Sequence, residues 1–170
     1  MENNTTEEMK FYDYVALDPN DNEIKMESFI GKVLVICNIA SDCGFASKNY
    51  KNFEGLREKF DKNQLEFLLF PCNQFLGQEP YPYETIRSKI DPYFKDYVLF
   101  KKVDVKGKNE HKLYKFLKKQ KGGLFSNLFM WNFTKFIIDT KGNVVKRLSS
   151  NNLVKEETIE KLLAEKSEES

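Results

Sequence analysis

The stretch Lys32-Val-Leu-Val-Ile-Cys-Asn-Ile-Ala-Ser-Asp-Cys-Gly-Phe45 decides the fold of this chain. It opens with an apolar, β-branched run, which is typical of a strand buried on both faces of a sheet. The run ends at Ser41-Asp-Cys-Gly44, and a helical pattern begins near Ser47. Cys43 therefore falls in a strand-to-helix turn, where the N–H groups at a helix N-terminus favour a thiolate over a thiol. One cysteine at this place predicts a redox or nucleophilic enzyme.

A second buried strand follows the helix over Leu65–Phe70 and ends at Pro71. Between the two strands, apolar residues recur at helical spacing on one face: Tyr50, Phe53, Leu56 and Phe60. Strand, helix and strand in this order predict a right-handed unit with parallel strands. The carboxyl ends of both strands then meet at one edge of the sheet, so Cys43 and residues 71–80 become neighbours. Sites in open α/β sheets lie at such an edge.

The remaining pattern completes one α/β domain. We expect an N-terminal hairpin of Phe11–Ala16 and Glu23–Met26, a helix over Thr85–Tyr93, an extended segment over Phe100–Val105, a helix capped by Asn109, a hairpin of Phe133–Asp139 and Asn143–Leu148, and a last helix over Lys155–Lys166. This order contains a thioredoxin-like core, a central mixed β-sheet flanked by helices, with the N-terminal β-hairpin added to it. We expect residues 1–10 to form a flexible N-terminal tail, 11–166 a single domain and 167–170 a flexible C-terminal tail.

Composition narrows the class of protein. The chain has 170 residues, of which 27 are basic and 26 acidic, and the net charge of +1 argues against a nucleic-acid partner. Its three cysteines are too few for a disulfide framework, and their spacing with the single His111 does not match a metal site. We predict no metal and no cofactor. With no signal-peptide pattern and no apolar run of membrane-span length, we expect a soluble, cytoplasmic protein in a reducing compartment.

The three cysteines have different expected roles. Cys43 could be a small buried apolar residue, but its turn, the flanking Gly44 and the following helix favour a reactive thiol. Cys37 lies in the middle of the apolar run and is expected to be an inert, buried thiol. Cys72 follows a strand end near the same edge as Cys43, so it could bridge to Cys43 or simply pack, and packing is favoured. His111 could be a general base, although a lone histidine is more often structural.

Two polar clusters could serve the thiol. The loop Pro71-Cys-Asn-Gln-Phe-Leu-Gly-Gln-Glu-Pro80 is rich in amides, and Met130-Trp-Asn-Phe-Thr134 sets the only tryptophan beside an amide. Indole and amide donors can stabilise a thiolate and hold a peroxide oxygen. Taken singly, the tryptophan is better explained by core packing, and the asparagine could cap a turn.

With these segments identified, the sequence closely resembles the glutathione peroxidase family, from about Phe11 to Leu163. The motifs that carry the resemblance, in the family's order, are Gly31-Lys-Val-Leu-Val35, Asn38-Ile-Ala-Ser-Asp-Cys-Gly-Phe45, Phe70-Pro-Cys-Asn-Gln-Phe75 with Gln78-Glu-Pro80, Lys102-Val-Asp-Val-Lys-Gly107 and Trp131-Asn-Phe-Thr-Lys-Phe136. Each motif alone is suggestive, and all five in order are highly specific.

The resemblance implies a thioredoxin-like fold and a thiol peroxidase of the cysteine branch. It implies a catalytic tetrad in which Cys43 is the peroxidatic residue and Gln78, Trp131 and Asn132 are its partners. The expected reaction reduces hydrogen peroxide and organic or lipid hydroperoxides to water or alcohols through a Cys43 sulfenic acid. Glutathione or a thioredoxin-type protein is the expected reductant.

Two positions depart from the family pattern. Members that use thioredoxin usually carry a resolving cysteine after the Gln-Glu-Pro segment, and residues 85–100 contain none. Cys72 is a possible resolving thiol, but its position is not the family's usual one, so we favour a one-cysteine cycle with an external thiol. The second departure is Ala46, where many relatives have threonine.

A short connection between Leu117 and Trp131 lacks the insertion of the family's tetrameric members, which implies a monomer of the phospholipid-hydroperoxide type. An apolar lip of residues 124–130 is then expected beside the site. Phe125, Phe129 and Lys119 are candidate substrate-binding residues that would let the enzyme contact a membrane surface. The alternative is ordinary packing under a loop, with a solvated cluster of Lys118, Lys119 and Lys121 beside it.

Other classes of protein fit less well. A thioredoxin-type exchanger needs Cys-x-x-Cys, but position 46 is alanine. A peroxiredoxin would show a proline and a Thr or Ser ahead of its cysteine, and no such proline precedes Cys43. A thioredoxin-fold peroxide sensor that passes oxidation to a partner stays open, because it shares the sulfenic acid chemistry and differs only in turnover.

Overall fold

A five-stranded mixed sheet forms the centre of the protein, in a computed structural model that describes residues 7–122 and 130–168. The strand order is β5-β4-β3-β6-β7. The strands are β3 (Val33–Ile39), β4 (Leu65–Pro71), β5 (Val98–Leu99), β6 (Lys135–Ile138) and β7 (Val144–Leu148). β3 pairs in parallel with β4 and antiparallel with β6, so it lies in the middle of the sheet. Every residue of β3 and β4 is buried, as the continuous apolar runs predict.

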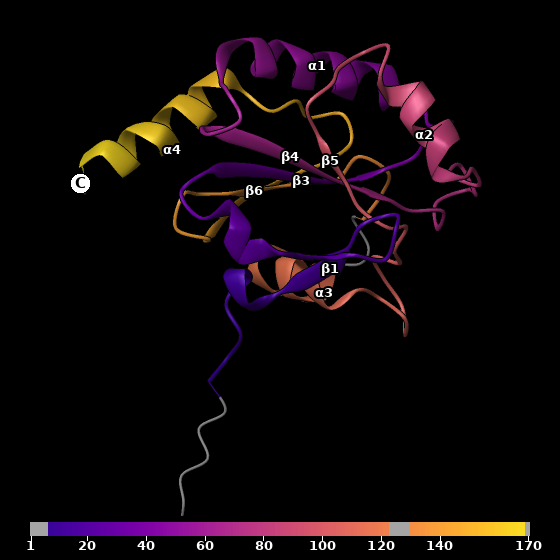
Figure 1. Cartoon of the computed structure of the whole chain (residues 1–170), viewed down its shortest axis with the longest axis horizontal. Helices are drawn as coiled ribbons and strands as arrows, with labels where there is room; N and C mark the ends of the chain where they lie inside the picture. The colour runs from indigo at the N-terminus through magenta and orange to yellow at the C-terminus, as the bar shows by residue number, and fades with distance from the viewer. Residues whose placement is uncertain (1–6, 123–129, 169–170) are drawn as a thin grey trace, which may run out of the picture.

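Helices cover both faces of this sheet (Figure 1). On one face lie α1 (Ala46–Lys59) and α4 (Glu156–Glu168), with α2 (Tyr83–Ile90) beside the end of α1. On the other face lie α3 (Lys112–Gln120) and a small hairpin of β1 (Val15–Leu17) and β2 (Glu23–Lys25). Short 3-10 turns precede and follow that hairpin at Phe11–Asp13 and Met26–Phe29.

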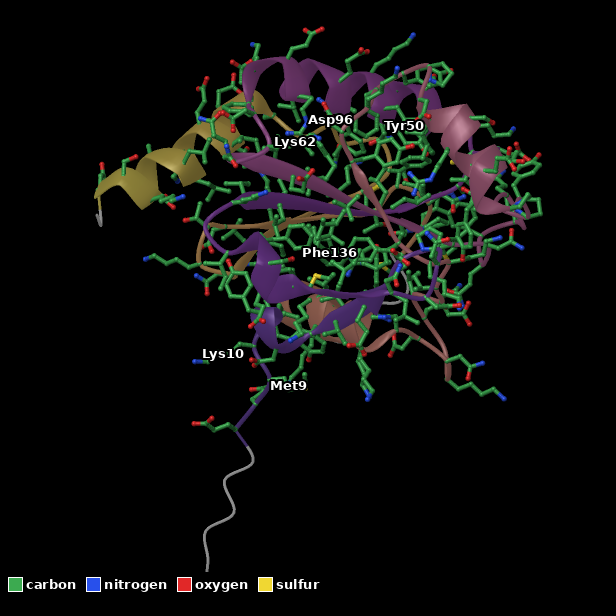
Figure 2. The ribbon with its side chains drawn as sticks, viewed as in Figure 1. Met9, Lys10, Tyr50, Lys62, Asp96 and Phe136 are labelled. Atoms are coloured by element: carbon green, nitrogen blue, oxygen red, sulfur yellow. The ribbon has the colours of Figure 1, made fainter. Side chains whose placement is uncertain are left out.

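The alternation of β3 side chains divides the core into two clusters. Val35, Cys37 and Ile39 face the cluster beneath α1, α2 and α4, whereas Leu34 and Ile36 face the cluster above α3 and the hairpin. Figure 2 shows the two sides, with Tyr50 beneath α1 and Phe136 on the opposite side of the sheet. We call these the α1-side cluster and the α3-side cluster.

Several expected elements begin elsewhere than the pattern suggested. Phe11 starts a 3-10 turn rather than a strand, and its ring is buried in the α3-side cluster. The helix expected from about Ser47 is α1, which begins one residue earlier, at Ala46, with Phe45 at its N-cap position. Asn109 does not cap α3: the cap is His111, whose Nδ1 accepts a hydrogen bond from the N–H of Leu113 at 3.2 Å. This bond gives the lone histidine a structural role.

Candidate functional site

Cys43 lies in the short connection between the carboxyl end of β3 and the start of α1. Its N–H donates to the carbonyl of Ala40 at 3.3 Å, and its own carbonyl accepts from the N–H of Ala46 at 3.0 Å. The residue is only 7 % exposed and packs in the α1-side cluster. The thiol is therefore held just ahead of a 14-residue helix, where the helix dipole stabilises negative charge.

Gln78 is brought to this connection from the loop after β4. The N–H of Asp42 donates to the main-chain carbonyl of Gln78 at 3.0 Å, so the two loops are joined one residue before Cys43. The side-chain Oε1 of Gln78 accepts from Nδ2 of Asn132 at 2.9 Å. An amide pair from two distant segments thus stands at the edge of the sheet where Cys43 lies.

Asn132 and Trp131 are positioned by the turn that leads into β6. Nδ2 of Asn38, in β3, donates to the carbonyl of Trp131 at 2.8 Å, and the N–H of Phe133 donates back to the carbonyl of Asn38 at 2.7 Å. Phe133 has a φ of 61°, a left-handed conformation that reverses the chain at this point. Asn132 is fully buried, and its carbonyl accepts from the hydroxyl of Ser150 at 2.5 Å.

Trp131 stays partly open to solvent. The residue is 39 % exposed, and its ring lies 5.2 Å from the ring of Phe75, centroid to centroid. The loop that carries Phe75 also carries Gln78, so this ring contact is a second link between the tryptophan turn and the amide loop. The indole is thus placed at the surface of the site rather than in the core.

The residues that hold this arrangement had no role assigned to them from the sequence. Asn38 interrupts an otherwise apolar strand, which was a usable signal, because a polar residue in a buried strand needs a hydrogen-bond partner. Ser150 and Glu79 carried no such signal. The side chain of Glu79 lies fully buried, and its Oε2 accepts from the N–H of Ser41 at 2.8 Å. Burial raises the pKa of this carboxyl to about 7.

A buried lysine lies behind the site. Lys135 is the register partner of Cys37 on the neighbouring strand, and its Nζ donates to Oδ1 of Asn49 at 2.6 Å and to the carbonyl of Ser149 at 3.1 Å. Burial lowers the pKa of this amine to about 8. These bonds tie β6 to α1 and to the segment after β7, next to the turn of Asn132.

The other two thiols are buried. Burial raises the pKa of Cys37 to about 12 and that of Cys72 to about 11, so neither is a ready nucleophile at neutral pH. Cys37 shares the α1-side cluster with Cys43, but Cys72 packs in the α3-side cluster across the sheet. The structure joins the loop of Gln78 to Asp42, next to Cys43, and joins Gln78 to Asn132, whereas Cys72 packs on the other face of the sheet.

Most of the predicted lip falls outside the described residues, Phe125 and Phe129 included. Met130, at its end, is buried. Lys119 is exposed near the end of α3 and forms an ion pair with Glu8. The expectation that Lys118, Lys119 and Lys121 are all solvated is wrong for Lys118. This lysine is buried and forms an ion pair with Glu110, because it lies on the inner side of α3.

Comparison with known proteins identifies relatives over most of the chain. Residues 11–118 match the family model described as glutathione peroxidase. The chain is 43 % identical over 150 residues to a probable phospholipid hydroperoxide glutathione peroxidase of Nicotiana sylvestris, covering 88 % of this chain and 89 % of the relative. A protein of the same description from Encephalitozoon cuniculi is 46 % identical over 150 residues, covering 86 % and 85 % of the two chains.

Solved structures agree with the fold. The T. cruzi GPX1 structure superposes with a TM-score of 0.74 at 30 % identity, over 92 % of this chain and 97 % of that one. A thioredoxin-like protein from Aeropyrum pernix superposes with a TM-score of 0.63 at 13 % identity, over 88 % and 89 % of the two chains, a likeness of fold alone. The predicted thioredoxin-like α/β fold, with its mixed sheet, flanking helices and N-terminal hairpin, is confirmed.

Proposed function

The chain belongs to the glutathione peroxidase family and is an oxidoreductase that acts on peroxides, and we propose that Cys43, Gln78, Trp131 and Asn132 carry its reaction. One observation carries this assignment. The two hydrogen bonds of Gln78, from Asp42 N–H to its carbonyl and from Asn132 to its side chain, join all three segments at the cysteine.

The reaction begins with attack of the Cys43 thiolate on one oxygen of the hydroperoxide. A sulfur–oxygen bond forms, the oxygen–oxygen bond breaks, and the departing oxygen takes a proton to leave as water or alcohol. Sulfur is oxidised by two electrons to the sulfenic acid. Two molecules of an external thiol then return it to the thiol, releasing water and one disulfide.

The three residues proposed as partners of Cys43 stabilise the negative charge that passes from sulfur to the leaving oxygen during the reaction. The amides of Gln78 and Asn132 and the indole N–H of Trp131 supply hydrogen-bond donors to the thiolate and to the leaving oxygen. Their own hydrogen bonds fix them before the peroxide arrives, so little reorganisation is needed during the reaction. The start of α1 adds its dipole on the same side.

The reducing half of the cycle uses one protein cysteine in this proposal. Cys72 is buried in the cluster across the sheet, and burial raises the pKa of its thiol, which supports an external reductant over an internal resolving thiol. Glutathione fits this cycle directly. A thioredoxin-type protein is the other candidate, and in this family it usually needs a resolving cysteine.

Organic hydroperoxides fit the surface beside the site. Trp131 is 39 % exposed and Leu76, in the loop that carries Gln78, is 76 % exposed, so two large apolar groups face solvent there. Relatives of this chain are named phospholipid hydroperoxide glutathione peroxidases. We include lipid hydroperoxides at a membrane surface among the substrates, and a monomer as the acting form. Among the described residues, no helix is long and apolar enough to cross a bilayer.

The test is peroxide consumption by the wild type, Cys43→Ser and Asn132→Ala, with glutathione and thioredoxin supplied separately. We expect no turnover in Cys43→Ser and a loss of about 10²-fold in Asn132→Ala, the cost of one removed donor. Asn151→Ala, which removes an exposed amide that binds Lys48, is the matched control and should keep full activity. Normal turnover by Cys43→Ser would refute the proposal.

A peroxide sensor is the second candidate, and turnover separates the two. In a sensor, Cys43 would be oxidised once and the reaction would stop even with either reductant in excess, whereas the peroxidase cycles.

Replacing Phe125 and Phe129 by serine tests the membrane lip: equal losses of activity on phospholipid hydroperoxide and on hydrogen peroxide would contradict it. Sedimentation of the purified protein tests the monomer.

A further inference from the structure

Glu79 is a buried acid that the reaction described above does not use. Its residue is 0 % exposed, and one carboxylate oxygen, Oε2, accepts from the N–H of Ser41 at 2.8 Å. The other oxygen, Oε1, has no hydrogen-bond partner among the described residues. Lys102 does not form an ion pair with this carboxylate: its Nζ donates at 2.6 Å to the main-chain carbonyl of Glu79.

The position of Glu79 links it to both halves of the site. It follows Gln78 directly, and its own N–H donates to Oδ1 of Asn73 at 2.9 Å, which fixes the amide loop from within. Its carboxylate reaches across to Ser41, two residues before Cys43. The Asp42–Gln78 main-chain bond runs beside it in the same direction. These are two adjacent bonds between the loops, and only the one made by Glu79 involves an ionisable group.

Ionisation of the Glu79 carboxyl is energetically unfavourable at its buried position. A glutamine of the same shape would accept the Ser41 N–H without burying an anion, and burial of an unpaired carboxylate is unfavourable. The pKa of Glu79 is raised to about 7, chiefly by desolvation and to a smaller extent by the negative charge of Asp42, while hydrogen bonds from Ser41 and the charge of Lys102 act to lower it. The ionisable groups close enough to act on it are Asp42, Tyr50, Tyr81, Lys89 and Lys102. A carboxyl of this kind beside a reactive residue is characteristic of functional sites.

We propose that Glu79 is a positioning residue for the reaction of Cys43. Its carboxylate accepts the hydrogen bond of the Ser41 amide and so fixes the cysteine loop against the loop of Gln78. The hydrogen bond is stronger once the carboxyl has lost its proton. A charge-assisted hydrogen bond is roughly twice as strong as a neutral one. The loop is therefore held more tightly as the pH rises through the neutral range, and the thiolate is better aligned with its amide partners. This inference rests on the proposed role of Cys43.

The experiment measures the rate constant for oxidation of Cys43 by hydrogen peroxide from about pH 6 to 8. Oxidation is followed by the fluorescence of Trp131, the only tryptophan, and each rate is divided by the thiolate fraction from ultraviolet absorbance, with Cys43→Ser as the blank. In the wild type we expect the oxidation rate per thiolate to rise about fivefold between the low and the high pH, with the midpoint of the rise near neutrality. The rise reflects the greater strength of the Ser41 hydrogen bond when Glu79 is charged than when it is neutral.

Three variants separate positioning from plain structure. Glu79→Gln keeps the acceptor for Ser41 without the charge, so its rate per thiolate should stay at the wild-type low-pH level throughout. Glu79→Ala loses the acceptor and should be slower still, so that glutamine rescues it in part. Glu66→Gln is the matched control: Glu66 is another buried acid with a raised pKa, but it is paired with Arg57 at 3.0 Å on β4 and should leave the pH profile unchanged.

Three results would overturn the inference: a wild-type rate per thiolate that does not rise with pH, a Glu79→Gln profile with the same midpoint, or one that stays at the wild-type high-pH level. Failure of the proposed function looks different. In that case the wild-type Cys43 would not react with peroxide at all, and both proposals would fall. Normal peroxide reactivity without dependence on Glu79 would remove this inference alone.

Discussion

At the scale of single residues, the proposed site contains side chains whose burial or exposure by itself disfavours folding. Glu79 is a buried carboxyl, Asn132 is a buried amide and Leu76 is an apolar side chain left in solvent. Each lies at or next to the segments that surround Cys43. Local choices that disagree with stability concentrate where function requires them.

Glu79 should make the stability of the fold depend on pH. Its pKa is raised from an ordinary 4.5 to about 7 in the folded protein, so the folded state binds the proton more tightly. The stabilisation is fully present below about pH 4.5 and is lost as the pH rises through 7. Glu79→Gln lacks this loss. Its free energy of unfolding should therefore exceed that of the wild type at pH 8 by up to about 3 kcal/mol, and by less at pH 5.

Urea denaturation of both proteins at the two pH values measures this difference. A gap between Glu79→Gln and the wild type that does not widen with pH would show that the carboxyl titrates as an ordinary exposed acid.

Leu76 should set the preference for organic hydroperoxides. Its φ of 59° is a strained conformation for leucine, and the side chain is 76 % exposed in the loop of Gln78. Leu76→Gly relieves the strain, so the variant should fold at least as well as the wild type. We expect kcat/KM for a lipid hydroperoxide to fall about threefold to tenfold, the loss of one apolar contact, with hydrogen peroxide unaffected. Leu76→Asn, which also tolerates this backbone, should behave alike; equal rates on both substrates would contradict the role.

At the scale of elements, the helix that follows Cys43 is anchored by amides rather than by packing alone. Asn49 in α1 donates to the carbonyl of Ser150 at 3.0 Å, and Asn52 both donates to the carbonyl and accepts from the N–H of Val154 at 3.0 Å. Ser150 in turn binds the main chain of Asn132. The C-terminal segment between β7 and α4 thus ties α1 to the turn that carries Trp131 and Asn132.

Asn52→Ala should weaken this anchor without touching the reacting groups. It leaves the N–H and carbonyl of Val154 unpaired, at a cost of about 1–3 kcal/mol in the free energy of unfolding. Asn151→Ala, in the same segment but exposed, should cost little. Chemical denaturation of the two variants compares them, and equal stabilities would show that the Asn52 bonds are replaced by solvent at no cost.

The elements themselves were largely predictable. Continuous apolar runs identified β3 and β4, and the helical spacing from Tyr50 to Phe60 identified α1. The expected segments Phe133–Asp139 and Asn143–Leu148 correspond to the β6–β7 hairpin. Boundaries were less predictable. The choice between Asn109 and His111 as the cap of α3 depended on which side chain meets the N–H of Leu113, and spacing along the chain does not encode that geometry.

At the scale of the whole molecule, the sheet separates two of the three cysteines. Cys43 packs with α1 in one cluster, and Cys72 packs in the other, on the far side of β3 and β4. A disulfide needs the two Cα atoms within about 7 Å and the side chains aimed at each other. Oxidation of Cys43 therefore leaves it without an internal partner on its own face except the buried Cys37.

Treatment with one equivalent of hydrogen peroxide should leave a Cys43 sulfenic acid that dimedone traps. Mass spectrometry of the digested protein should find that adduct and no Cys43–Cys72 disulfide, and Cys72→Ser should keep full turnover with glutathione. A Cys43–Cys72 disulfide formed at the rate of turnover would instead make Cys72 the resolving thiol, and would require the edge of the sheet to open.

The sequence alone determined the position of Cys43 between a buried strand and a helix, because apolar periodicity and a break in it are local properties of the chain. Its motifs also indicated the family, which the comparisons confirmed. Only the tertiary structure decided that Asn132 binds Gln78 across 54 positions of sequence, that Glu79 is buried under Ser41, and that Cys72 faces away from Cys43. These depend on strand order, register and side-chain direction, which arise when distant segments pack together and which no local pattern encodes.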